Sequence, residues 1–111
     1  MIKDPFLYLD HILESIEALE KYRGNLSKDD FVDSLLIQDA MCRRLEIIGE
    51  AASKIDDAFK EKYPDVPWYK IVGMRNLLIH EYFHVDLDQV WNTVKKSIPE
   101  LKKQILEMYK K

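Results

Sequence analysis

The sequence predicts an all-α protein, an antiparallel bundle of four to five helices that forms a single domain over residues 1–111. The chain holds only three glycines and four prolines, and this scarcity disfavours a fold of strands and tight turns. Apolar residues recur at helical spacing in four segments. Short connections link these segments, as in an up-down bundle.

The first predicted helix begins at Asp4 and Pro5, a capping residue followed by proline at the first helical position. Residues 23–25, which include a glycine, end it. Ser27 then offers an N-cap for a short helical turn that carries Phe31. The apolar positions of the first helix are Phe6, Leu9, Ile12, Leu13, Ile16 and Leu19.

The second long helix is predicted over residues 35–62, with an apolar surface broad enough to contact more than one partner helix. Gly49 lies in its middle, where glycine costs about 1 kcal/mol relative to alanine. We therefore expect another backbone to approach closely there. Glu46 and Glu50 are four residues apart, an unfavourable spacing for like charges, so we expect one of them to meet a cation from another helix.

Residues 63–67 contain two prolines and form the clearest break in the helical pattern. A third helix is predicted to begin at Pro67 and to continue through the run 75–84. A fourth is predicted to begin near Asp86, a capping residue. Pro99 is expected to kink or interrupt this last helix, because proline lacks the N–H group that a helix interior needs.

Charge and composition exclude several classes of function. The net charge is −3, so the body of the protein is not a general nucleic-acid binder. Contact with RNA would require a local site or a basic patch assembled between subunits. The single cysteine, Cys42, cannot form an internal disulfide. We expect a cytoplasmic protein, because the N-terminus lacks the pattern of a signal peptide and no apolar run is long enough to span a membrane.

The run from Arg75 to His84 holds the densest group of possible catalytic residues, and three interpretations are open. Residues 80–84 read His-Glu-x-x-His, a zinc-binding pattern, but no later histidine supplies a third ligand. A second interpretation is metal-free RNA cleavage, with His80 as acid or base and Arg75 binding phosphate. The third is structural, with capping and surface ion pairs as the only roles. Arg43 and Arg44 could extend a phosphate-binding patch.

Helical geometry constrains how these residues can cooperate. Arg75 and His80 are five positions apart, which corresponds to about 7.5 Å of rise and about 140° of rotation, so the two side chains do not share a face. Asn76 and His80 do share one. Two copies of the helix that meet across a two-fold axis could assemble a compact site, supplying two histidines and two arginines.

Residues 75–82 resemble the R-x4-H-x-Y motif of the HEPN superfamily, in its HepT-like branch. Further similarity lies in residues 45–52, in residues 63–76, which form the turn between two helices and lead into the motif, and in residues 82–91. It covers essentially the whole chain, and several motifs in the right order are more specific than the motif alone.

The resemblance implies a dimerising bundle that acts as the toxin of a HEPN/MNT toxin–antitoxin module. Arg75 and His80 would be the catalytic residues of a metal-independent endoribonuclease without a cofactor, supported by Asn76. The partners would be an RNA substrate, a second copy or a higher oligomer, and a minimal nucleotidyltransferase (MNT) antitoxin that AMPylates Tyr82. AMP there would add bulk and negative charge beside the site. The alternative is a non-catalytic helical partner of the nucleotidyltransferase or of a nucleotide.

Overall fold

The structure is a computed structural model that describes residues 4–80 and 86–110; for residues 76, 77, 79 and 80 it describes the backbone alone. Within these ranges every regular element is helical, as the sequence predicts. None of the helices there is long and apolar enough to cross a membrane. The elements are α1 (Pro5–Arg23), α2 (Lys28–Val32), α3 (Leu35–Ser53), α4 (Asp57–Glu61), α5 (Trp68–His80), α6 (Leu87–Asn92), η2 (Thr93–Ser97) and α7 (Ile98–Tyr109).

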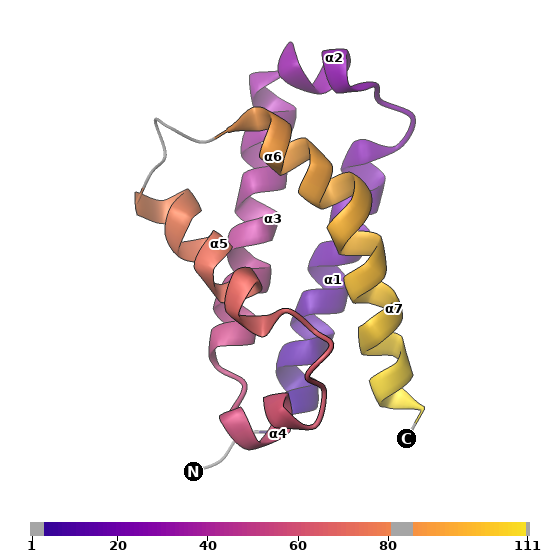
Figure 1. The fold of residues 1–111 in the computed structure, drawn as a ribbon. Helices are drawn as coiled ribbons and strands as arrows, with labels where there is room; N and C mark the ends of the chain where they lie inside the picture. Colours follow the sequence, from indigo (N-terminus) through magenta and orange to yellow (C-terminus); the bar gives the residue numbers. More distant parts are fainter. Residues whose placement is uncertain (1–3, 81–85, 111) are drawn as a thin grey trace.

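Helix α3 is the centre of the bundle. It packs against α1 on one side and α5 on another, while α1 also contacts α7. Figure 1 shows α1, α3 and the α6–α7 unit along the long axis of the molecule, with the short helices α2 and α4 at opposite ends. Because α3 has two neighbours, its broad apolar surface is used as expected. Its fully buried residues are Met41, Leu45, Ile48 and Ala52.

The predicted caps form as expected at three helix starts. The Asp4 carboxylate accepts a hydrogen bond from the N–H of Phe6 at the start of α1. Ser27 and Asp30 exchange side-chain and backbone hydrogen bonds at the start of α2, each 3.1 Å long. The Asp86 carboxylate accepts from the first turn of α6. These bonds satisfy N–H groups that have no partner inside the helix.

The end of α1 also agrees with the prediction. Gly24 has a φ of 44°, which is a left-handed conformation. Its N–H donates to the carbonyl of Glu20 at 3.0 Å. Glycine adopts this conformation without the steric cost that a Cβ would add.

The prediction of one continuous helix over residues 35–62 is wrong. Helix α3 ends at Ser53, and α4 begins after Asp56. The Ser53 hydroxyl donates to the carbonyl of Glu50 at 2.7 Å, and the Asp56 carboxylate accepts from the N–H of Phe59 at 2.8 Å. Both are local bonds that compete with helix continuation. The break brings the Phe59 ring against Phe6 of α1, with centroids 5.8 Å apart.

Pro99 lies at an interruption of the last helix, as expected. It lies in the first turn of α7, directly after the π-helical turn η2. A proline ring clashes with the carbonyl four residues before it and removes one hydrogen bond. A wider π-helical turn accommodates such a gap without breaking the helix.

Candidate active site at the junction of helices α3 and α5

Helix α5 carries the candidate site, and its start is fixed by contacts with the preceding turn. The indole N–H of Trp68 donates to the carbonyl of Tyr63 at 3.1 Å. The N–H of Ile71 donates to the carbonyl of Pro67 at 3.1 Å, so Pro67 caps the helix, which itself begins at Trp68. These bonds set the position from which α5 crosses α3.

Helix α5 approaches α3 closely at Gly49. A Cβ built on Gly49 would lie 2.2 Å from the Cβ of Arg75 and 3.0 Å from the carbonyl oxygen of Ile71. Any side chain there would collide with the stem of Arg75 and with the backbone of α5. The expectation that another backbone approaches Gly49 is therefore confirmed.

The other end of the Arg75 side chain meets the next residue of α3. An Nη of Arg75 lies 2.9 Å from a carboxylate oxygen of Glu50. The second oxygen of Glu50 lies 3.5 Å from the Nζ of Lys54, one turn further along α3. The side chain of Arg75 is about one-third exposed, so the guanidinium is accessible at the surface while its stem is packed. This ion pair confirms that one of the two glutamates meets a cation from another helix.

Glu46 takes a different partner, from its own helix. One of its carboxylate oxygens accepts a hydrogen bond from an Nη of Arg43 at 3.2 Å. A concavity of about 520 Å³ lies between α1, α3 and α5, and the residues that line it include Arg43, Glu46, Glu50 and Arg75. Arg43 and Arg75 thus face one hollow, but each is paired with a carboxylate.

The remaining predicted site residues are described only in part. Asn76 and His80 belong to α5, but their side chains lie outside the described residues. Tyr82 lies outside the described residues entirely, as do Glu81 and His84 of the His-Glu-x-x-His pattern. Their positions relative to Arg75 stay predictions. Among the side chains that the structure describes, no group of three or more histidine, cysteine or acidic residues is placed to hold a metal ion.

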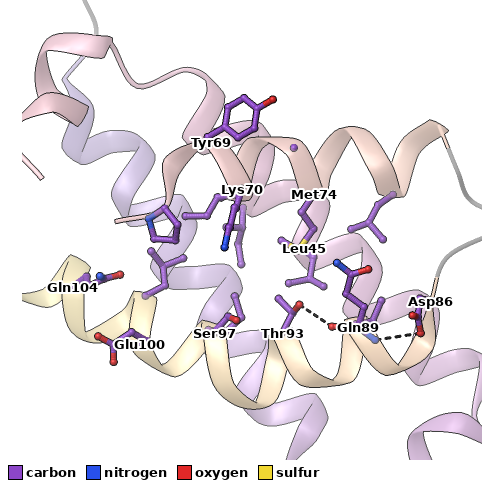
Figure 2. A pocket seen from close by; sticks show the side chains of 18 of the residues that line it. Leu45, Tyr69, Lys70, Met74, Asp86, Gln89, Thr93, Ser97, Glu100 and Gln104 are labelled. Atoms are coloured by element: carbon purple, nitrogen blue, oxygen red, sulfur yellow. Dashed lines mark hydrogen bonds between the residues drawn. The ribbon is translucent and has the colours of Figure 1, made fainter. Parts of the chain in front are cut away.

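A groove of about 980 Å³ lies on the other side of α5, between that helix and the α6–α7 unit. Figure 2 shows Lys70 and Met74 projecting from α5 toward Gln89, Thr93 and Ser97 on the opposite wall. The groove has a largely apolar floor that includes Leu45, Ile48, Ile71, Leu78 and Val90.

Tyr69 and Gly73 lie at the rim of this groove, on an uncovered side of α5. Tyr69 is 92% exposed, and its ring points away from the opposite wall of the groove (Figure 2). A Cβ built on Gly73 would meet no atom within 4 Å. The packing of the described chain therefore gives no reason for a glycine at position 73.

The fold and the site together define a class of protein. It is an all-α bundle in which the central helix α3 packs against and pairs with an accessible arginine of the neighbouring helix α5. A model of the protein family described as "Ribonuclease HepT-like" matches residues 12–108. The chain therefore belongs to this family, which confirms the resemblance seen in the sequence.

Relatives with assigned names agree with this placement. A "Putative RNase" of Caldanaerobacter subterraneus subsp. tengcongensis is 46% identical over 99% of this chain and 98% of its own length. A "Probable ribonuclease HepT" of Thermococcus cleftensis is 44% identical over 86% of each chain. A Methanocaldococcus jannaschii protein, named "Gamma-glutamylcyclotransferase and putative RNase", is 50% identical over 97% of this chain. The chain spans about half (49%) of that protein's length. No solved structure matches the chain significantly.

Proposed function

We propose that this protein is an endoribonuclease whose active centre is built on α5 from Arg75 and His80. The observation that carries the proposal is the family match over residues 12–108. It is supported by relatives named as ribonucleases that align with most of the chain. The local geometry is compatible, because Arg75 presents a partly exposed guanidinium at the surface of the helix that also contains His80.

The proposed reaction is an internal transesterification of RNA. The 2′-oxygen forms a bond to phosphorus and the bond from phosphorus to the 5′-oxygen breaks, which leaves a 2′,3′-cyclic phosphate and a 5′-hydroxyl. One group takes the proton of the 2′-hydroxyl and another protonates the leaving oxygen, and histidine suits both steps near neutral pH. Arg75 would bind the non-bridging phosphate oxygens, because a guanidinium fork matches phosphate geometry. Asn76 would support His80 or the substrate.

We further propose that the active form is a homodimer or higher oligomer in which α5 of one copy meets α5 of another. Arg75 and His80 are separated by about 140° around a regular helix, so one copy does not bring both to one point. Gly73 supports this interface, because glycine costs about 1 kcal/mol within a helix and nothing in the described chain requires it. Close approach of a second backbone would supply the missing reason.

The regulatory part of the proposal concerns Tyr82. A minimal nucleotidyltransferase antitoxin would transfer AMP from ATP to its hydroxyl, and the added phosphate would repel RNA from Arg75. The test is the intact mass of the protein after co-expression with such an enzyme, comparing wild type with Tyr82→Phe. Gains in steps of one AMP on the wild type alone would support this mechanism; no gain on either protein, or the same gain on both, would contradict it.

The test of the nuclease proposal is cleavage of RNA by purified protein, with and without EDTA. We expect wild type to cleave in both conditions, since the proposed chemistry uses side chains alone. His80→Ala should lose at least 100-fold of the rate, in keeping with the usual contribution of a general acid or base. Glu107→Ala, at an exposed position of α7 that does not line the hollow around Arg75, is the control and should cleave like wild type. Equal rates in all three would contradict the catalytic role. Binding of the nucleotidyltransferase without RNA cleavage would favour the non-catalytic alternative.

A further inference from the structure

Two consecutive residues of α3 contact the two ends of one side chain of α5. Gly49 faces the stem of Arg75, where a built Cβ would lie only 2.2 Å from the arginine Cβ. Glu50 faces the guanidinium, with 2.9 Å between its carboxylate oxygen and an Nη of Arg75. The stem and the head of Arg75 are therefore both located by α3, although the arginine belongs to another helix.

This arrangement limits the freedom of a side chain that is otherwise among the most flexible. A free arginine carries about 2 kcal/mol of rotamer entropy. Packing against Gly49 restricts the first torsions, because the Cβ and Cγ of Arg75 lie within 3.1 Å of the built position. The Nε atom is buried, and the Glu50 carboxylate directs the terminal part of the guanidinium. Glu50 is itself held by Lys54 at 3.5 Å.

We propose that Glu50 is a positioning residue for Arg75: its carboxylate holds the guanidinium in the orientation in which it receives an RNA phosphate. This inference rests on the proposed ribonuclease function. A guanidinium has five N–H donors in a fixed fork, more than one carboxylate oxygen can accept from. Glu50 can therefore orient the fork while phosphate binds at another edge. Such preorganisation matters because displacement of a catalytic group by about 1 Å can cost roughly 100-fold in rate.

Because Glu50 is negatively charged, its replacement by a neutral residue should affect substrate binding and the catalytic step in different ways. The carboxylate neutralises part of the positive charge that an RNA phosphate would meet. Replacing it with the neutral Gln should therefore leave substrate binding unchanged or make it tighter. The same change removes the charge-assisted contact that orients the guanidinium, so the catalytic step should slow.

The first experiment compares kcat and KM for RNA cleavage in wild type, Glu50→Gln and Glu20→Gln. The control residue, Glu20 of α1, pairs with Lys102 of α7 at 2.9 Å, the same distance as in the Glu50–Arg75 pair, and does not line the hollow that holds Arg75. We expect Glu50→Gln to lower kcat by about 10- to 100-fold without raising KM. Glu20→Gln should match wild type, and the thermal midpoints of all three should agree within a few degrees. A kcat of Glu50→Gln within twofold of wild type would overturn the proposal, and so would a raised KM with unchanged kcat.

The second experiment tests positioning without any RNA. The chain has only four arginines, so the Nε–Hε signal of Arg75 can be assigned by comparison with Arg75→Lys. We expect the order parameter of this group to fall in Glu50→Gln and to stay unchanged in Glu20→Gln. An unchanged order parameter in both variants would overturn the inference. Because this readout needs no catalysis, it decides the role of Glu50 even if wild type fails to cleave RNA, a result that would contradict the proposed function instead.

Discussion

Gly49→Ala should destabilise the fold, although alanine is the better helix former. The added Cβ would lie 2.2 Å from the Cβ of Arg75 and 3.0 Å from the carbonyl oxygen of Ile71. Carbon atoms in contact are normally about 3.5–4.0 Å apart, so α5 would have to move by more than about 1 Å. Neither opposing atom can rotate away, because one is backbone and the other is attached to it. Overpacking of this kind costs about 1–3 kcal/mol.

Gly73→Ala is the matched control for this prediction. It lies within α5, and a Cβ there meets no atom within 4 Å. Both substitutions gain the same helix propensity, about 1 kcal/mol, so the difference between the two variants isolates the collision. We expect Gly49→Ala to be less stable than Gly73→Ala by about 1–3 kcal/mol.

The assay is urea and thermal unfolding followed by circular dichroism. It is run at protein concentrations where sedimentation shows wild type and both variants as monomers, so that the proposed α5 interface at Gly73 does not contribute. For a domain of this size, 1 kcal/mol corresponds to about 4 °C in Tm, so Gly49→Ala should melt roughly 4–12 °C below Gly73→Ala. If the two variants differ by less than about 0.5 kcal/mol, the close approach of α3 and α5 does not constrain position 49. A weaker self-association of Gly73→Ala, measured separately, would support the proposed α5 interface.

Three further predictions concern the rest of the bundle. Asp86→Ala should lose about 1 kcal/mol of unfolding free energy in urea, because the start of α6 loses its cap; no change would show that the cap contributes nothing. Phe31→Ala should cost about 3–5 kcal/mol in the same assay, because the fully buried ring packs on Trp91 at 5.4 Å between centroids; a loss below 1 kcal/mol would refute this. Burial, helped by two nearby carboxylates, raises the pKa of Cys42 to about 11. At pH 8 iodoacetamide should therefore alkylate Cys42 about 100-fold more slowly in the folded protein than in urea, and equal rates would contradict the shift. Because the unfolded thiol ionises first, stability should also fall as the pH rises from about 9 to 11.

The break between α3 and α4 shows where sequence reasoning fell short. Between positions 35 and 62 the apolar residues keep a helical spacing across the break, and Ile55 and Phe59, which follow the end of α3, are buried. Periodicity alone therefore predicted one helix. The local signals were Ser53 and Asp56, whose side chains bond to nearby backbone groups and end one helix and start the next. Such residues are common inside helices as well, so their effect depends on whether tertiary packing favours the turn.

For the candidate site, too, some features could be predicted from the sequence and others could not. The motif with Arg75 and His80 could be recognised in the sequence, and the position of Gly49 within a helix predicted that another backbone approaches it. The sequence did not predict which cation pairs with Glu50, because either glutamate could have paired with any of several lysines and arginines. Only the crossing of α5 over α3 selected Glu50 for Arg75 and left Glu46 with Arg43.

The sequence by itself determined the helical class, most helix ends and the family, because caps, proline positions and apolar periodicity act over a few residues. The tertiary structure decided where α3 ends and which acidic residue holds Arg75. Both depend on the distance and angle between helices that are far apart along the chain. Those quantities follow from how whole faces pack against each other, which no local pattern records.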